Sequence, residues 1–344
     1  MTCRTACLII RPRMGTHRAR LTDILAVFSA AGWKTETAFD APGAHTMQLA
    51  KDAAEAGYDL VIAYGGDGTL NQVVNGVMAA KRRGCIIGHI PGGTANVWAH
   101  EIGMPEAPAG ASRLLVNSEE RKVDLGFVEL AWPPLPPGTT DGANIGEHHF
   151  VLMAGLGLDA AILRRVSTRL KEKIGAAAVV LAAVQAVPCH HAFPIEIRSS
   201  GAGGDEGVLW EGRALQVIVG NTRRYGNIAV VTPGAYIDDG VLDVCVVTAG
   251  SLFTTLGQIL SILLHRKPGR GHARYFQGAH FWISVPASVD LQLDGGVVEL
   301  KDRLAAPDRT ALITYRFDAV PRALGVAIPR TYDGALFVSG RPGG

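Results

Sequence analysis

A glycine-rich turn between an apolar segment and an amphipathic one constrains the fold of this chain more than any other feature. The turn lies in the eight-residue stretch YGGDGTLN, residues 64–71. It follows the apolar run Leu60–Ala63, which has the length and β-branched content of a buried strand, and apolar residues recur after it at helical spacing. A strand, a tight turn and a helix are therefore expected in this order.

The glycines of this turn favour binding of an anion. Gly65, Gly66 and Gly68 allow positive φ angles and leave backbone N–H groups uncovered, and the N-terminus of the following helix adds unpaired N–H groups. Phosphate is the expected anion. Because the carboxylate of Asp67 would repel phosphate unless a cation or a proton transfer is involved, the stretch indicates magnesium-assisted phosphoryl transfer. A plain tight turn with Asp67 as a helix cap is the alternative interpretation.

Strand-like and helix-like segments alternate throughout the N-terminal part. The expected strands are residues 6–10, 33–39, 60–63 and 85–90, with helices between them. This order predicts a mostly parallel sheet with helices on both faces, and such sheets bind ligands beyond the carboxyl ends of their strands. A second glycine turn, PGGTAN at residues 91–96, follows the strand 85–90. We therefore expect it to belong to the same site, with the hydroxyl of Thr94 available to a ligand.

The chain changes character after residue 130. A stretch rich in proline, glycine and polar residues, 131–149, precedes short strand candidates with few helices between them. The expected strands are 149–154, 193–197, 214–220, 228–231, 241–247, 281–285 and 289–293, and the expected helices are 160–186 and 252–264. This pattern predicts a mainly antiparallel second domain over residues 131–319. The apolar tail segments 323–328 and 335–338 are expected strands, so that residues 320–344 complete the first domain, residues 1–130.

Composition sets wider bounds. The 344 residues suffice for two domains with separate cores. The net charge of +2 is uninformative, but the lack of a basic segment with interleaved aromatic residues argues against a nucleic-acid partner. The five cysteines form no CxxC pair, which favours a reducing cytoplasm over a disulfide framework or a zinc site. No apolar run reaches the ~20 residues of a spanning helix. The basic residues after helix 252–264 suggest either contact with an anionic membrane or the solvated end of a core helix.

Four motifs in order resemble the diacylglycerol kinase catalytic family, which includes bacterial soluble lipid kinases and the sphingosine and ceramide kinases. The motifs are GGDGTLN at 65–71 followed by VVNG at 73–76, PGGTAN at 91–96, GLGLD at 155–159 and AYIDDGVLD at 235–243. NAD kinases and phosphofructokinases carry strings similar to the first motif, whereas the ordered set of four is much more specific.

The resemblance implies an α/β N-terminal domain with a parallel sheet, similar to NAD kinases, that binds ATP, and a β-sandwich C-terminal domain for the lipid. Contacts with ATP are implied for Thr37, Gly65, Gly66, Asp67, Gly68, Thr69, Leu70, Asn71, Gly93 and Thr94. A structural Mg²⁺ ion is implied at the carboxylate of Asp239 and the backbone carbonyls of Tyr236 and Val241. The catalytic candidates are Asp67, for magnesium or proton transfer, and Asp294.

The chain departs from the family pattern at three places. The family's Asp-Gly-Glu is Asp294-Gly295-Gly296 here, so the proton acceptor must be Asp294, Asp67 or a neighbour such as Glu299. Gln72 stands where glutamate is common, and Arg11-Pro12 replaces Asn-Pro after the first strand. We expect these three changes to be compatible with nucleotide binding and to affect catalytic competence.

The expected function is ATP- and Mg²⁺-dependent phosphorylation of a hydroxyl of diacylglycerol or a similar lipid, such as ceramide or a sphingoid base. The expected partners are ATP and a membrane lipid, the expected location is the cytoplasm with peripheral contact at the inner membrane face, and a homodimer is left open. Two alternatives are a catalytically impaired regulator that binds nucleotide or lipid, and a small-molecule kinase similar to NAD kinases.

Overall fold

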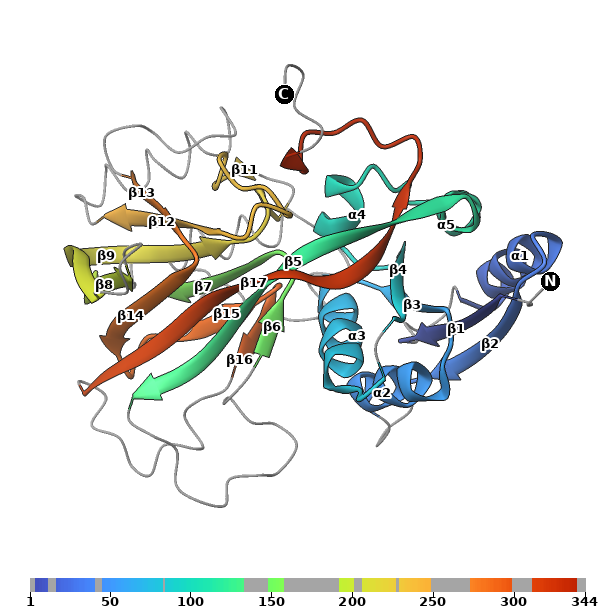
Figure 1. Cartoon of the computed structure of the whole chain (residues 1–344), viewed down its shortest axis with the longest axis horizontal. Helices are drawn as coiled ribbons and strands as arrows, with labels where there is room; N and C mark the ends of the chain where they lie inside the picture. Colours follow the sequence, from blue (N-terminus) through green and yellow to red (C-terminus); the bar gives the residue numbers. More distant parts are fainter. Residues whose placement is uncertain are drawn as a thin grey trace. The chain divides into compact units, whose positions relative to one another are not determined.

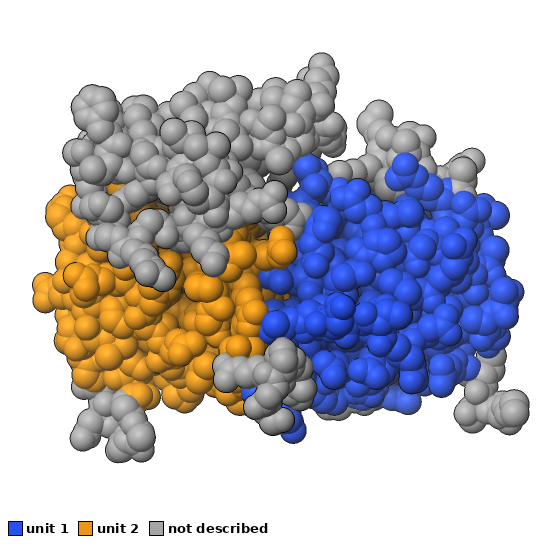
Figure 2. Space-filling view, turned by 90° about the horizontal axis from the view of Figure 1, so that it is seen from above, with its two compact units in different colours: residues 1–124, 322–344 blue, residues 125–321 orange. Residues whose placement is uncertain are grey.

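The computed structural model describes residues 4–11, 17–40, 45–82, 84–132, 148–157, 192–200, 206–226, 229–248, 273–298 and 311–338. The chain divides into two compact units, residues 1–124 with 322–344 and residues 125–321 (Figure 2). Both divisions lie inside long strands, β5 (Ser118–Trp132) and β17 (Leu312–Pro329), which contribute residues to both units. The sequence analysis predicts these divisions after residues 130 and 319. The pattern of apolar residues identifies a strand, but it does not show at which residue of a long strand one unit ends and the other begins.

The first unit is a parallel sheet with helices. Its strands are β1 (Thr5–Ile10), β2 (Lys34–Phe39), β3 (Leu60–Gly65), β4 (Ile86–Pro91) and the last part of β17, and its helices are α1 (His17–Ala30), α2 (Thr46–Ala56), α3 (Asp67–Ala79), α4 (Val97–Glu101) and α5 (Pro108–Val116). The strand order is β2-β1-β3-β4-β17, and these neighbours pair in parallel (Figure 1). The predicted α/β fold with a parallel sheet is confirmed.

The strand order of this sheet reverses at β1. The chain passes from β1 outward to β2, then returns to β3 on the other side of β1 and continues to β4. Because β-α-β crossovers are right-handed, α1 lies on one face and α2 and α3 lie on the other, and accordingly α2 packs against α3 while α1 packs against α5. The carboxyl ends of β1 and β3 are therefore a topological switch point, where doubly wound sheets bind ligands.

The second unit consists mainly of antiparallel strands. Besides parts of β5 and β17 it contains β6 (His148–Phe150), β7 (Met153–Gly157), β8 (Phe193–Ser200), β9 (Glu206–Gly220), β10 (Arg224–Tyr225), β11 (Ala229–Val230), β12 (Leu242–Thr248), β13 (Ala273–Gly278), β14 (His280–Pro286), β15 (Leu291–Leu293) and β16 (Gly296–Val298). The strands follow the order β16-β15-β7-β9-β8-β14-β17, and β12 pairs with both β9 and β13. Aromatic rings fill the core, among them Phe150, Phe281, Tyr315 and Phe317. The predicted antiparallel second domain is confirmed.

Some predicted elements differ from the structure. Residues 149–154 belong to two strands, because Val151 and Leu152 leave the ladder and donate their N–H groups to a carboxylate side chain. Residues 335–338 form turns and not a strand, although Leu336 and Phe337 are buried. The helix α5 and the strand β13 are additions to the predicted elements.

The expected helices 160–186 and 252–264 lie outside the described residues, as does Glu299. Among the helices that are described, none combines the length and the apolar composition needed to cross a bilayer.

Candidate active site

The two glycine turns leave the carboxyl ends of β3 and β4 and touch one another. A Cβ atom at Gly93 would lie 2.4 Å from the Cα atom of Gly66, so the two backbones approach as closely as glycine permits. The N–H group of Gly92 donates to the carbonyl oxygen of Gly65 at 2.8 Å. The structure thus brings together the two motifs that the sequence assigns to one sheet edge.

Asp67 links these turns through its carboxylate. Its Oδ2 accepts the N–H group of Val97 at 3.0 Å, and its Oδ1 accepts that of Trp98 at 3.1 Å. Both donors belong to the first turn of α4, where N–H groups have no partner within the helix and a negative charge is favourable. Asp67 therefore caps α4, and not the helix α3 that it begins. A carboxylate has about four lone-pair sites, so these two bonds leave acceptor capacity for a metal or a proton.

Asn96 fixes the second turn. It is buried and adopts a left-handed conformation with φ of 48°, which asparagine tolerates better than most residues. Its Oδ1 accepts the N–H group of Gly93 at 2.7 Å, and its Nδ2 donates to the carbonyl of Gly93 at 3.2 Å. Thr94 lies in the middle of the turn held in this way and is partly exposed.

The first turn of α3 presents unused N–H groups. Hydrogen bonds among the described residues use the carbonyl of Gly66, but none of them uses the N–H groups of Gly66, Asp67 or Gly68. Outside its own helix backbone and chain neighbours, a Cβ atom at Gly68 would meet no described residue within 4 Å, so a ligand can approach this backbone. Unused N–H groups at a helix N-terminus with open space beside them fit an anion.

Other predicted ATP contacts are less central to this arrangement. Thr69 and Leu70 are buried in α3, and the side chain of Thr69 packs over Gly65, where an added Cβ would lie 2.5 Å from its Oγ1. Asn71 accepts hydrogen bonds from the side chain of Asn75 within the same helix. Thr37 is exposed on β2, which β1 separates from β3. The structure therefore does not bring Thr37 to the glycine turns.

His89 is a residue of the site that the sequence does not single out. It lies on β4, is 1% exposed, and places Nε2 2.9 Å from the carbonyl oxygen of Gly65. Its Nδ1 is buried without a hydrogen-bond partner among the described residues. Burial lowers the pKa of the ring, an effect that the charge of Asp67 partly opposes. The available signal was a single imidazole in the otherwise apolar run 85–90.

Asp294, the second catalytic candidate, is a buried carboxylate of the second unit. Its oxygens accept the N–H groups of Val151, Leu152 and Met153 at 2.8, 2.9 and 3.0 Å. The residue is 3% exposed and has a φ of 46°, which directs the chain into the glycine pair that follows β15. Three charge-assisted hydrogen bonds hold the break between β6 and β7 in place. A structural role explains the aspartate independently of any role in chemistry.

The predicted magnesium ligands lie in the loop before β12. The Oδ1 atom of exposed Asp239 accepts the N–H group of Val241 at 3.2 Å, which folds the loop back on itself. The ring of Tyr236 lies under the guanidinium of Arg223, 4.6 Å from its centroid to the Arg223 Cζ atom. The described residues contain no group of three or more His, Cys, Asp or Glu side chains placed to hold a metal ion. The predicted magnesium site does not require such a group of side chains, because two of its three ligands are backbone carbonyls.

Asp243 adds negative charge near this loop. It is 5% exposed, and its Oδ1 accepts a hydrogen bond from Nε2 of Gln277 at 3.0 Å. Its Oδ2 is buried and has no partner among the described residues. Burial raises the pKa of this carboxyl to about 6, and the nearby charge of Asp239 contributes. A cation at the loop would therefore relieve an unfavourable concentration of charge.

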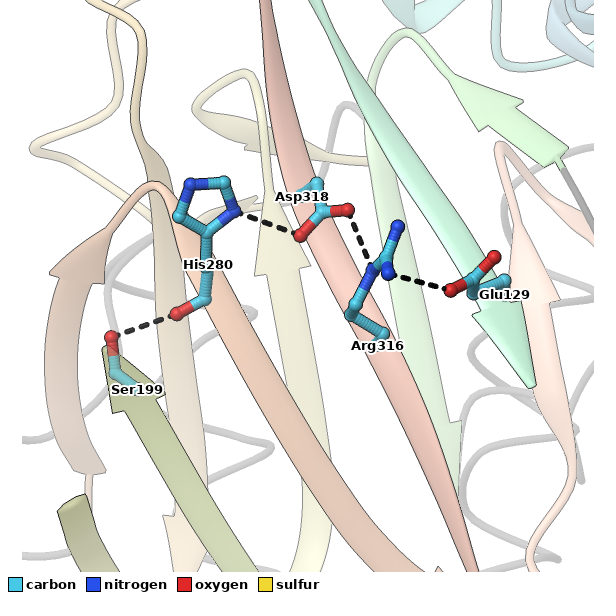
Figure 3. Close-up of polar contacts among 5 residues, drawn as sticks. All are labelled: Glu129, Ser199, His280, Arg316 and Asp318. Atoms are coloured by element: carbon cyan, nitrogen blue, oxygen red, sulfur yellow. Dashed lines mark hydrogen bonds and ion pairs between the residues drawn. The ribbon is translucent and has the colours of Figure 1, made fainter. Parts of the chain in front are cut away.

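A polar network in the second unit resembles a hydrolase triad in composition but not in geometry (Figure 3). His280 Nδ1 lies 2.9 Å from Asp318 Oδ1, and Arg316 bridges Asp318 and Glu129 at 2.8 and 3.0 Å. The hydroxyl of Ser199 donates to the backbone carbonyl of His280 at 2.7 Å and not to its ring. The nucleophile–base contact of a triad is therefore missing, and the network links β5, β17 and β14 as partly exposed ion pairs of small energetic worth.

Known proteins show similarity along most of the chain. Residues 5–128 match the family model of the diacylglycerol kinase catalytic domain, and residues 153–303 match that of the YegS C-terminal NAD kinase beta sandwich-like domain. A diacylglycerol kinase of Bacillus subtilis (strain 168) is 26% identical over 291 residues, which cover 84% of this chain and 88% of that protein. A Pseudomonas aeruginosa PAO1 protein named "Probable lipid kinase YegS-like" is 30% identical over 286 residues, covering 82% and 80%. The crystal structure of a diacylglycerol kinase from Bacillus anthracis str. Sterne has the same fold, with a TM-score of 0.65, 18% identity and coverage of 96% and 97%.

Proposed function

Because this chain belongs to the family of bacterial diacylglycerol kinases and YegS-like lipid kinases, we propose that it transfers the γ-phosphate of ATP to a hydroxyl group of diacylglycerol or a similar lipid. The observation that carries the proposal is the pair of touching glycine turns at the carboxyl ends of β3 and β4, the first of them beside the switch point of the first unit. There the N–H groups of residues 66–68, which no described residue accepts, would provide a site for phosphate.

Phosphoryl transfer asks the protein mainly to position the reactants and to stabilise negative charge. The N–H groups at the start of α3 would bind phosphate oxygens, and the hydroxyl of Thr94 would add a further donor. The lipid hydroxyl oxygen forms a bond to the γ-phosphorus, the bond from that phosphorus to the bridging oxygen breaks, and ADP leaves. The lone pairs that Asp67 retains would accept the hydroxyl proton or hold a metal ion beside the phosphates, with Asp294 as the second candidate for the proton.

Mg²⁺ at the loop before β12 is part of the proposal. The carboxylate of Asp239 and the carbonyls of Tyr236 and Val241 are all oxygen donors, which Mg²⁺ prefers. The buried Oδ2 of Asp243, which has no hydrogen-bond partner in the described part of the chain, supports a cation nearby. The ion, when bound, would neutralise these carboxylates and order the loop.

Asp239→Ala is expected to remove most of the stabilisation that Mg²⁺ gives to the protein. A ligand at a hundredfold excess over its Kd stabilises the folded state by about 2.7 kcal/mol, which corresponds to several degrees in melting temperature. The measurement is thermal unfolding of wild type and variant with and without millimolar MgCl₂. Glu211→Ala, which removes an exposed carboxylate of the same unit, serves as the control. An equal magnesium shift in wild type and D239A would contradict the assigned ligand.

Since the substrate is a membrane lipid, the enzyme is proposed to work in the cytoplasm at the inner membrane face. The assay uses purified protein, labelled ATP with Mg²⁺, and a panel of diacylglycerol, ceramide, sphingosine and NAD. Transfer to a lipid supports the proposal. Transfer to NAD alone would replace it with an NAD-kinase-like activity, and nucleotide binding without any transfer would favour a regulator.

Gly68→Ala is expected to weaken ATP binding without destabilising the protein. Apart from its own helix backbone and chain neighbours, the added methyl group meets no atom of the described residues within 4 Å, and alanine is favoured over glycine within a helix by about 1 kcal/mol. If the phosphates approach this backbone, the methyl group stands in their way, and we expect a loss of roughly tenfold or more in affinity, about 1.4 kcal/mol. Thermal unfolding and calorimetric titration with an ATP analogue measure the two effects.

Gly93→Ala provides the contrasting variant. Its methyl group would collide with the backbone of Gly66, so it is expected to lower the free energy of unfolding by about 1–3 kcal/mol as well as to impair binding. Unchanged ATP affinity in the stable G68A variant would show that the open space beside Gly68 is not used by the nucleotide.

A further inference from the structure

The carbonyl oxygen of Gly65 accepts two hydrogen bonds from the neighbouring strand and turn. One comes from the N–H group of Gly92 at 2.8 Å, and the other from Nε2 of His89 at 2.9 Å. Because a carbonyl oxygen only accepts, Nε2 must carry the ring proton. His89 is 1% exposed, so bulk water does not compete with its ring for the Gly65 carbonyl.

The position of this carbonyl determines the direction of the next N–H group. A trans peptide is planar, and its C=O and N–H bonds point in opposite directions. The Gly65 carbonyl points toward β4, and the N–H group of Gly66 must therefore point away from β4. That N–H group is one of the three that no described residue uses.

Packing alone does not account for a histidine at this position. The other buried side chains of β4 include Ile87 and Ile90, and an aliphatic residue at 89 would fill the same interior without burying a polar nitrogen. The ring instead keeps a buried Nδ1 with no partner among the described residues, which costs free energy. What the ring supplies in return is the donor to Gly65.

We propose that His89 is a positioning residue of the nucleotide site: its Nε2–H group holds the Gly65 carbonyl and thereby directs the Gly66 N–H group at a phosphate oxygen of ATP. This role depends on the proposed function, because it presupposes that ATP binds at the first glycine turn. It makes the ring a determinant of ATP affinity and not of lipid affinity.

Three variants distinguish the effect of the hydrogen-bond donor from the effect of the volume of the ring. His89→Leu removes the donor and keeps an apolar side chain, His89→Gln keeps an N–H donor, and Ile87→Ala perturbs the same strand without removing a donor. Calorimetry with a non-hydrolysable ATP analogue and Mg²⁺ gives the affinity, kinetics give separate KM values for ATP and for the lipid, and thermal unfolding reports stability.

H89L is expected to weaken binding of the analogue about tenfold and to raise the KM for ATP by the same factor, which is the effect of losing one buried hydrogen bond. The KM for the lipid is expected to stay unchanged. H89Q is expected to restore affinity to within about threefold of wild type. I87A is expected to lower the melting temperature while the affinity stays at the wild-type value.

Equal ATP affinity of H89L and wild type would overturn the role of His89, and so would an H89Q variant as weak as H89L. Should H89L not fold, NMR of the Gly66 amide group in wild type and H89Q provides the test. We expect its resonance to shift in both proteins on saturation with the analogue, and a resonance that shifts in neither would refute the role. A wild-type protein that does not bind the analogue at all would refute the proposed function itself, before any variant is compared.

Discussion

Asp67→Ala is expected to abolish phosphoryl transfer. The substitution removes the two hydrogen bonds to the N–H groups of Val97 and Trp98, so α4 loses its tie to the first glycine turn. It also removes the carboxylate that is proposed to manage a metal ion or the substrate proton, a type of contribution worth about 10²–10⁴-fold in rate. The measurement is the rate of labelled phosphate transfer from ATP to diacylglycerol.

Asp67→Asn separates the two contributions of this side chain. Asparagine keeps one oxygen acceptor for the start of α4, so the variant is expected to fold and bind nucleotide while its rate of transfer falls by about 10²–10⁴-fold. Asp52→Asn, which alters an exposed carboxylate of the same unit, should keep the wild-type rate. Full turnover by D67A would show that the carboxylate has no part in catalysis, and full turnover by D67N would limit it to capping α4.

Asp294→Ala is expected to destabilise the second unit by about 3–5 kcal/mol. Three N–H groups, those of Val151, Leu152 and Met153, would lose a buried anionic acceptor, and no described side chain replaces it. For a unit of this size the loss corresponds to about 10 °C in melting temperature. Thermal and urea unfolding of the full chain measure it.

Two further variants test the explanation for Asp294. Asp294→Asn keeps one oxygen acceptor but turns an amide group toward one of the N–H donors, so an intermediate loss of about 2 kcal/mol is expected. Glu211→Ala, an exposed carboxylate in the same unit, should change stability by less than about 0.5 kcal/mol. A melting temperature of D294A equal to that of wild type would contradict the structural role. Transfer by folded D294N that falls far more than its folded fraction would support Asp294 as proton acceptor.

The parallel sheet was predictable because its signals are local. The run Leu60–Ala63 is uniformly apolar and is buried in β3 at every residue, and the glycines that follow mark the turn. The order of strands and helices then determines which strand ends share an edge. The meeting of the two glycine turns follows from that order, since β3 and β4 pair directly.

The polar contacts of the site were not predictable, because their partners are far apart in sequence. Asp67 lies thirty residues from its partner Val97, and Asp294 lies 143 residues from Val151. A sequence shows that each aspartate needs an explanation: chemistry was the one available for Asp294, and chemistry or a helix cap for Asp67. The structure shows that both also satisfy buried or helix-terminal N–H groups, a demand that becomes visible only when the backbone is placed.

Two other differences have the same origin. Residues 335–338 are apolar enough for a strand, yet they form turns, because burial of Leu336 and Phe337 does not require ladder hydrogen bonds. The sequence gives no reason to single out His89 within the expected strand 85–90. Its importance depends on the Gly65 carbonyl, which lies across the β3–β4 pair.

The central claim is that the phosphates of ATP bind at the first glycine turn of the first unit. Hydrogen–deuterium exchange of the full chain, with and without saturating ATP and Mg²⁺, tests it most directly. We expect slower exchange in the peptides that cover residues 65–71 and 92–97. Saturable ATP binding with unchanged exchange in both of these segments would contradict the claim.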